Sequence, residues 1–196
     1  MDVLPLFETT EAYLQGHFRL TSGLHSSRYL QCARVLQHPA YAEQLGQALA
    51  NRLKALTAVA EIGLVVSPAM GGLIIGHEVA RALGTPFIFT ERGPDTQMTL
   101  RRGFSVHPGT AVAVVEDVVT TGGSTREVIE LLRQLGARPV VAGSIIDRSG
   151  GNATLPGVPF QALCTLQVET YQPEACPLCA AGLPVTKPGS RPSASN

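Results

Sequence analysis

The sequence predicts an α/β protein with an open, mostly parallel sheet, helices on both faces of that sheet, and a small N-terminal subregion. Two observations carry this prediction. Short, continuous apolar runs are typical of parallel strands that are covered on both faces. Helical segments lie between these runs, and such alternation indicates a layered sheet. The four predicted strands are residues 62–66, 86–89, 111–115 and 140–146.

Three helices are predicted between the strands, because apolar side chains recur there every three or four residues. They cover residues 41–56, 73–83 and 124–135. In the last of them, Ser124 and Glu127 form a predicted capping box, in which each side chain accepts a backbone N–H at the other residue. In a sheet of this kind, ligands bind at the carboxyl ends of the strands.

Length and charge limit the domain organisation and the partners. The 196 residues predict a single domain over residues 1–183, to which residues 1–35 contribute the subregion. The segment 184–196 is rich in Pro, Gly and Ser and is predicted to be disordered. Fifteen basic residues balance fifteen acidic ones, which argues against nucleic acid or an anionic membrane surface as a partner.

The sequence also indicates the compartment. It has no apolar run of membrane-spanning length and no signal segment at its start. Its four cysteines are too few for a secreted disulfide scaffold. We therefore expect a cytoplasmic protein.

One segment, residues 114–125, carries the predicted chemistry. A buried strand ends in Glu116 and Asp117, and a turn of hydroxyl residues and glycines leads into a helix N-terminus. Such a turn binds anions, and Gly122 and Gly123 permit the close approach of a phosphate. Two carboxylates beside an anion site predict a ligand that also carries hydroxyls or a hydrated cation. A sugar phosphate with Mg²⁺ meets both requirements.

The segment is not a nucleotide P-loop, since no lysine follows the glycines, and it lacks the spacing of a dinucleotide fingerprint. Its sequence, VVEDVVTTGGST, resembles the phosphoribosyl-diphosphate signature of the type I phosphoribosyltransferases, and the orotate branch is the most similar. Three further stretches support that resemblance: residues 16–29 resemble the family's N-terminal hood, 67–72 its pyrophosphate-side loop, and 146–148 a strand end that supplies an arginine to orotate.

The resemblance implies a type I phosphoribosyltransferase-like fold in which the N-terminal subregion is the hood. It implies an enzyme that transfers the phosphoribosyl group of 5-phospho-α-D-ribose 1-diphosphate to orotate, in pyrimidine biosynthesis. The products would be orotidine 5'-monophosphate and pyrophosphate. Mg²⁺ would be the cofactor, and a homodimer with a shared active site would be the assembly.

Two alternatives remain open at this point. The same scaffold could serve another base, such as a purine, or it could be a regulator that senses phosphoribosyl diphosphate without turnover. The zero net charge and the absence of a convincing helix-turn-helix in residues 1–35 favour an enzyme over a regulator.

The resemblance also assigns roles to residues. Glu116 and Asp117 would act in catalysis, at the ribose hydroxyls and on the positive charge that develops on the ring. Thr120 and Arg148 would contact orotate, the arginine through the carboxylate. Phosphoribosyl diphosphate would be bound by Asp117, Val118, Val119, Thr120, Thr121, Gly122, Gly123, Ser124 and Thr125.

A pyrophosphate clamp is expected in the polar stretch 90–103, which is long enough to form a lid. The family usually places lysines there, whereas this chain has Arg92, Arg101 and Arg102. Thr21 and Gly71 likewise stand where the family often has lysine. Arginine would therefore supply the positive charge of the site.

Cys176 and Cys179 form a C-x-x-C pair, which is half of a zinc ribbon. A closed site needs two more ligands, and the two other cysteines, Cys32 and Cys164, would have to converge on the pair. We therefore expect no bound metal, with a zinc site shared between subunits as the alternative. His17 and His25 are expected to pack in the hood or to face solvent rather than to act in catalysis.

Overall fold

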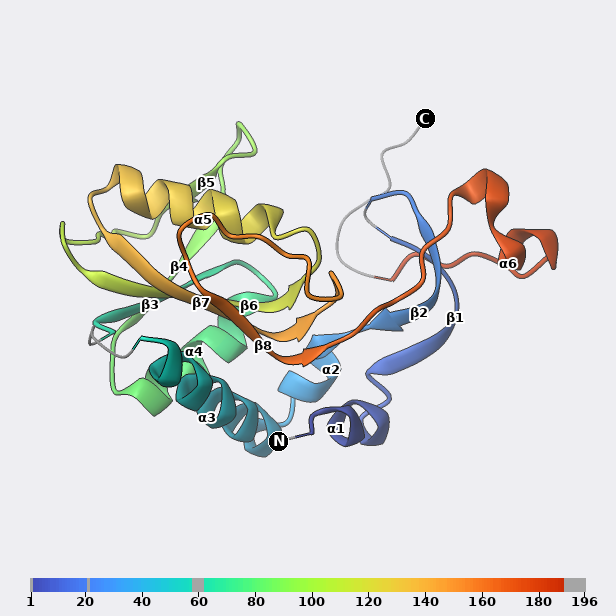
Figure 1. Ribbon diagram of the computed structural model, residues 1–196, viewed down its shortest axis with the longest axis horizontal. Coiled ribbons are helices and arrows are strands. Elements are labelled where there is room, and N and C mark those ends of the chain that lie inside the picture. The colour runs from blue at the N-terminus through green and yellow to red at the C-terminus, as the bar shows by residue number, and fades with distance from the viewer. Residues whose placement is uncertain (1, 21, 58–61, 189–196) are drawn as a thin grey trace.

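The computed structural model describes residues 2–20, 22–57 and 62–188, and its centre is a six-stranded sheet (Figure 1). The strand order is β5-β4-β3-β6-β7-β8, and every neighbouring pair is parallel except β4 and β5. The strands are β3 (Leu64–Pro68), β4 (Phe87–Arg92), β5 (Met98–Leu100), β6 (Ala111–Val119), β7 (Arg138–Asp147) and β8 (Phe160–Thr165).

Helices cover both faces of the sheet, as predicted. Helices α3 (Pro39–Leu56) and α4 (Gly72–Leu83) pack on one face, and α5 (Gly123–Gln134) packs on the other (Figure 1). Consecutive strand residues therefore enter different cores: Val65 joins the α3 and α4 side, whereas Leu64 and Val66 join the α5 side. This two-sided burial explains why the strands are continuous apolar runs.

Two strands of the sheet were not predicted from the sequence. The short strand β5 pairs antiparallel with β4, so that Thr90 faces Leu100, and this hairpin replaces much of the long loop predicted over 90–103. Buried Thr90 Oγ1 lies 3.6 Å from Met98 Sδ, which closes the hairpin on the core side. The other unpredicted strand, β8, forms the opposite edge of the sheet.

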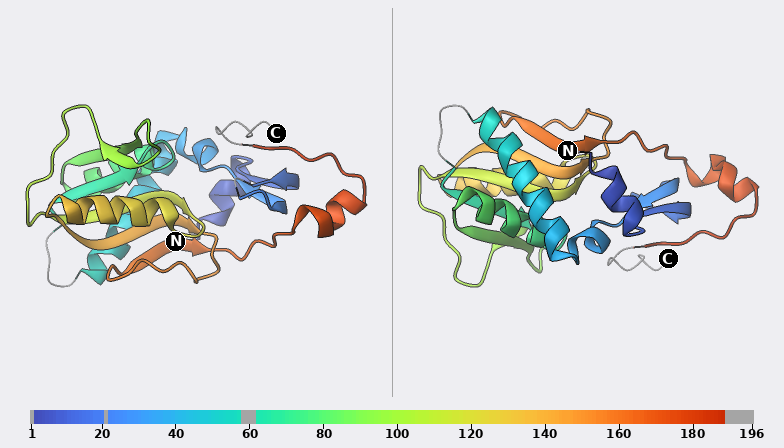
Figure 2. Two further views of the ribbon diagram at one scale, coloured as in Figure 1. Left: turned by 90° about the horizontal axis from the view of Figure 1, so that it is seen from above. Right: turned by 90° about the horizontal axis from the view of Figure 1, so that it is seen from below.

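The N-terminal subregion is a two-stranded antiparallel hairpin, β1 (Tyr13–Arg19) and β2 (His25–Leu30), between two short helices. The helices are α1 (Leu4–Thr9) and α2 (Cys32–Leu36), and they contribute Phe7 and Val35 to the core on the α3 side. The hairpin lies beyond one end of the sheet, as the two views of Figure 2 show. We refer to it below as the hood hairpin.

After β8 the chain returns to the hood hairpin and contacts both of its edges. Tyr171 and His25 exchange two backbone hydrogen bonds of 2.8 Å, and Thr186 bonds to His17 and Arg19 on the other edge. Between them lie the 3-10 turn η1 (Pro173–Ala175) and the short helix α6 (Pro177–Ala180). Thr186, which lies within the segment predicted to be disordered, makes these backbone contacts, and residues 189–196 lie outside the described residues. Within the described ranges, no helix is long and apolar enough to cross a membrane.

Candidate active site

Asp117 lies near the carboxyl end of β6, where the sequence places the chemistry. The side chain is half-buried, and its Oδ1 accepts the N–H of Val118 at 2.9 Å. Burial raises the pKa of the Asp117 carboxyl, and hydrogen bonds from Val118 and with Glu116 partly offset the rise. Glu116, the preceding residue, is buried. The strand thus places two adjacent carboxyl groups near the carboxyl end of the sheet.

The loop after β3 packs directly against this carboxylate. A Cβ atom added to Gly71 would lie 2.5 to 2.8 Å from the carboxylate atoms of Asp117, closer than any real contact. The loop also contains a cis peptide bond between Ala69 and Met70, and its Ala69 N–H donates to Thr90 on β4. A side chain at position 71 would therefore displace the carboxylate of Asp117 from this position.

The turn between β6 and α5 is formed by glycine at the helix start. Gly122 is the N-cap of α5 with φ of 75°, a backbone conformation that strongly favours glycine. No side chain caps this helix, so its first N–H groups remain available to an anion. Thr120 and Thr121 are exposed on the turn. Arg126 holds the turn in place, since its Nη1 donates to the carbonyl of Thr121 at 2.6 Å.

The predicted capping box is therefore wrong. Helix α5 begins one residue earlier than expected, which places Ser124 inside the first turn, and Glu127 is paired with Arg92 instead. A self-capped helix would occupy the N–H groups that an anion-binding turn has to leave available.

Arg148 follows β7 and lies beside the turn, because its N–H donates to the carbonyl of Val119 at 2.8 Å. This bond brings Arg148 next to Thr120. The Nε of Arg148 is buried and has no hydrogen-bond partner among the described residues. Burial lowers the pKa of the guanidinium, and the nearby Tyr29 and Cys32 act in the opposite direction. A half-buried cation with an unused donor is a candidate site for an anionic group.

Tyr29 of the hood hairpin lies near Arg148 and Asp117, although Tyr29 was not among the predicted site residues. Burial raises the pKa of its hydroxyl; Arg148 lowers that pKa and Asp117 raises it, so all three side chains lie within electrostatic range. Nearby Cys32 is fully buried, and burial raises its pKa well above the usual value, with Asp117 adding to the rise. Cys32 therefore remains a thiol and is no candidate nucleophile.

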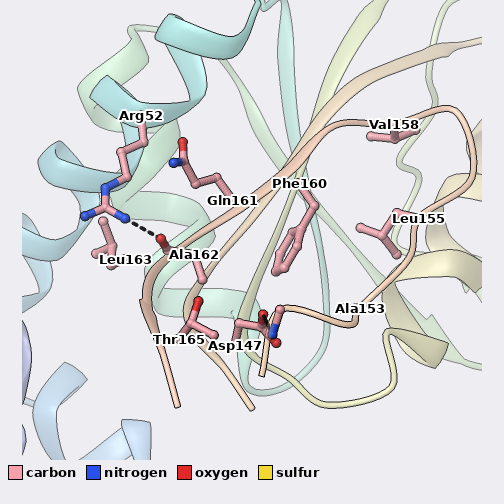
Figure 3. A pocket seen from close by; sticks show the side chains of 11 residues that line it. Arg52, Asp147, Ala153, Leu155, Val158, Phe160, Gln161, Ala162, Leu163 and Thr165 are labelled. Carbon is pink, nitrogen blue, oxygen red and sulfur yellow. Dashed lines mark hydrogen bonds between the residues drawn. The ribbon is translucent and has the colours of Figure 1, made fainter. Parts of the chain in front are cut away.

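A cavity of about 390 Å³ lies along β8, lined also by the loop after β7 and by Arg52 of α3 (Figure 3). Its charged side chains already have partners: Arg52 donates to the carbonyl of Ala162, and Asp147 accepts the N–H groups of Ser149 and Gly151. Asp147 thus stabilises the backbone of the loop after β7. Because the charged side chains of this cavity already have partners, the carboxyl end of the sheet around Asp117 is the better candidate for the active site.

The three arginines predicted to clamp pyrophosphate are not gathered around Asp117 by any described contact. Arg92 forms a two-point ion pair with Glu127 on α5, at 2.7 and 3.1 Å. Arg102 forms another with Glu91, at 2.8 Å for both bonds, and its guanidinium lies over the ring of Phe89. Arg101 is exposed. Two of the three side chains therefore have acidic partners within the chain.

The pairing of Glu127 with Arg92, rather than with Ser124, can be tested by double-mutant cycles on the free energy of unfolding. We expect Arg92→Ala and Glu127→Ala to be coupled by about 0.2–1 kcal/mol, as is usual for a partly exposed ion pair. We expect no measurable coupling between Ser124→Ala and Glu127→Ala. The opposite pattern, with coupling only to Ser124, would restore the capping box.

Comparison with known sequences identifies the family of the chain. The family described as "Phosphoribosyl transferase domain" matches residues 31–154. A protein of Desulforamulus reducens named orotate phosphoribosyltransferase is 54% identical over 190 residues, 97% of this chain and 96% of the relative. The protein of that name from Thermotoga maritima is 54% identical over 186 residues, covering 95% and 96%.

Solved structures agree with these sequence matches. The crystal structure of orotate phosphoribosyltransferase from Aeropyrum pernix superposes with a TM-score of 0.70 and 27% identity, and the match covers 85% of this chain and 94% of that one.

Proposed function

The chain belongs to the orotate phosphoribosyltransferase family, and from that premise we propose that it joins orotate to the phosphoribosyl group of 5-phospho-α-D-ribose 1-diphosphate. A ring nitrogen of orotate bonds to C1 of the ribose and loses its proton to solvent, and the bond from C1 to the pyrophosphate oxygen breaks. The products are orotidine 5'-monophosphate and pyrophosphate. The reaction is a glycosyl transfer in pyrimidine biosynthesis.

The observation that carries this proposal is the position of Arg148. Its buried, unpartnered Nε lies beside the turn that follows β6. Orotate carries a planar carboxylate, which a guanidinium binds through parallel hydrogen bonds. Exposed Thr120, the next residue after the hydrogen-bond partner of Arg148, is close enough along the chain to contact the same base. A neutral purine offers Arg148 no such anion.

The turn and the start of α5 support binding of the phosphoribosyl diphosphate. The N–H groups and hydroxyls of residues 120–125 would hold the 5'-phosphate, since the uncapped helix N-terminus leaves donors available. Asp117 and Glu116 would face the ribose hydroxyls. Their negative charge would stabilise the positive charge that develops on the ring as the C1–O bond breaks.

The carboxylates at the carboxyl end of the sheet could bind Mg²⁺ that arrives in a complex with the substrate. The carboxylates of Glu116 and Asp117 are oxygen donors of the kind that Mg²⁺ prefers, and no trio of carboxylates gathers in the described parts of the chain. The diphosphate would therefore supply most of the ligands. When bound, the ion neutralises charge on the departing pyrophosphate.

For the pyrophosphate itself we propose the arginines of the β4–β5 hairpin and the following loop. Arg101 is exposed, and Arg92 and Arg102 would exchange Glu127 and Glu91 for the diphosphate. Such an exchange is feasible because both ion pairs are solvent-accessible and therefore weak. We further propose a cytoplasmic homodimer in which one subunit completes the active site of the other.

The test is a panel of bases with Mg²⁺ and phosphoribosyl diphosphate, in which pyrophosphate release is measured. We expect release with orotate and background rates with adenine, hypoxanthine and uracil. Turnover with a purine but not orotate would contradict the proposed base. Binding of phosphoribosyl diphosphate without turnover on any base would instead indicate a sensing regulator.

A further inference from the structure

The C-x-x-C pair meets two histidines of the hood hairpin. One donor atom from each of His17, His25, Cys176 and Cys179 lies within 4.8 Å of the other three. We call these four residues the Cys2His2 cluster. From the sequence, no bound metal was expected, because a closed site required Cys32 and Cys164 to converge on the pair; neither of them belongs to this cluster. His17 and His25 are buried in the hood hairpin, but they face the two cysteines there.

Three of the distances between the donor atoms match those of a tetrahedral zinc site. Zinc bonds of about 2.0–2.1 Å to nitrogen and 2.3 Å to sulfur put neighbouring ligand atoms about 3.3 to 3.8 Å apart. Here His17 Nε2 lies 3.6 Å from Cys176 Sγ and 3.7 Å from Cys179 Sγ. Cys179 Sγ lies 3.3 Å from His25 Nδ1. The two histidine nitrogens, 2.8 Å apart, need to separate only slightly.

The hydrogen bonding of His17 orients the ring as a ligand. Its Nδ1 lies 2.8 Å from the carbonyl oxygen of Leu183, which can only accept, so Nδ1 carries the proton. The lone pair of Nε2 is then directed at the cysteine sulfurs. Metal-binding histidines commonly have such a backbone or carboxylate partner on the other nitrogen, which fixes the tautomer.

The fold builds this arrangement from three segments. Arg19 pairs with His25 in the hairpin, so His17 and His25 are diagonal neighbours on one face of the two strands. Cys176 precedes the first turn of α6, and this turn returns Cys179 to the same point. Backbone bonds of Tyr171 and Thr186 fix the returning chain on both edges of the hairpin. The four ligands are thus positioned by main-chain contacts.

We propose that the Cys2His2 cluster binds one Zn²⁺ as a closed structural site that fastens residues 166–188 to the hood hairpin. Two thiolates and two imidazoles are a donor set that selects zinc among the common divalent ions. Four protein ligands leave no open position for substrate, so the site is structural. All four ligands come from one chain, and no second subunit is required.

A zinc link of this kind would stabilise the hood hairpin. A two-stranded hairpin is marginally stable on its own in water. This hairpin carries Tyr29 to the candidate active site, and its strands form no part of the central sheet. A metal that binds only the folded arrangement adds its binding free energy to folding.

Metal content of purified protein is the first test, with expression and purification carried out without added zinc. We expect about one zinc per chain in the wild type and in Cys164→Ser, a control at a half-exposed cysteine outside the cluster. Cys179 is exposed, so Cys179→Ser leaves the core intact, and we expect at least tenfold weaker zinc binding in competition with a chelator. Zinc near zero in the wild type, or equal binding by both variants, would overturn the proposal.

A spectroscopic and thermal test uses the wild type alone and so avoids misfolded variants. After zinc is removed, Co²⁺ should give the intense visible bands of a tetrahedral site with thiolate charge transfer. Zinc should raise the melting temperature of the stripped protein. An octahedral cobalt spectrum, or a Cys176–Cys179 disulfide in freshly purified protein, would contradict the site. These readouts do not use activity, so failure of the proposed function would leave them unaffected.

Discussion

Asp117→Asn is expected to lower the turnover number at least tenfold, which corresponds to at least about 1.4 kcal/mol of transition-state stabilisation. The substitution removes the negative charge that we place beside the ribose ring and retains the shape of the side chain. Asparagine can still accept the Val118 N–H through its Oδ1, so the turn keeps its anchor. Steady-state kinetics with orotate and phosphoribosyl diphosphate measure the effect.

The same substitution has a second, independent signature in the pH dependence of stability. Burial raises the pKa of Asp117 above the value of about 3.9 expected in the unfolded chain. Between these two values the folded protein keeps a proton that the unfolded chain releases, so the free energy of unfolding falls as pH rises. The asparagine side chain cannot titrate. We therefore expect the variant to lose this slope and to be at least as stable as the wild type at neutral pH.

Asp2→Asn is the matched control, because Asp2 is exposed and likewise accepts a backbone N–H, that of Leu4. It should keep both the turnover number and the pH dependence of the wild type. Near-normal turnover of Asp117→Asn would remove Asp117 from the mechanism. A large loss of stability would show that the carboxylate is structural.

Arg148→Ala is expected to raise the KM for orotate about 10- to 100-fold, the range for loss of hydrogen bonds to a charged group. The KM for phosphoribosyl diphosphate should change far less, because we propose that Arg148 contacts the base and not the phosphoribosyl group. Steady-state kinetics with each substrate varied in turn separate the two effects. Arg148→Lys should recover only part of the loss, since an ammonium cannot make two parallel bonds to a carboxylate.

The control for this experiment is Arg138→Ala. Arg138 is exposed at the opposite end of the same strand, β7, and its loss should leave both KM values unchanged. Equal weakening of both substrates by Arg148→Ala would argue against a direct contact with orotate. It would point instead to a general role for Arg148 in holding the turn through Val119.

The layered sheet could be predicted from the sequence because its strands are buried on both faces. In β3, for example, Val65 and Val66 enter different cores, so apolar side chains occupy both faces of the strand. Asp117 and the glycine turn were also predictable, since strand, turn and helix are contiguous in the chain. Edge strands lack this signal. Strand β8 contains Gln161 and lies at the edge, where only one neighbour pairs with it.

The remaining features depend on contacts between distant segments, which a local pattern does not contain. The capping box failed because Arg92, from another element, competes for Glu127. Tyr29 comes within electrostatic range of Arg148 only once the hood hairpin is placed at the end of the sheet. The partners of Cys176 and Cys179 were sought among cysteines, whereas the structure supplies histidines from the other end of the chain.

The return of the chain to the hood hairpin has a consequence for folding during synthesis. The hydrogen bond between Ser26 and Glu169 joins residues 143 positions apart, and the one between His17 and Leu183 joins residues 166 positions apart. Neither bond can form until the later residue has been synthesised. Contacts of such large sequence separation form slowly and late. The strands of the sheet are therefore synthesised, and can pair, before the segment that holds the hood hairpin in place. Residues 169–186, which are synthesised after the strands of the sheet, supply the contacts that hold the hood hairpin.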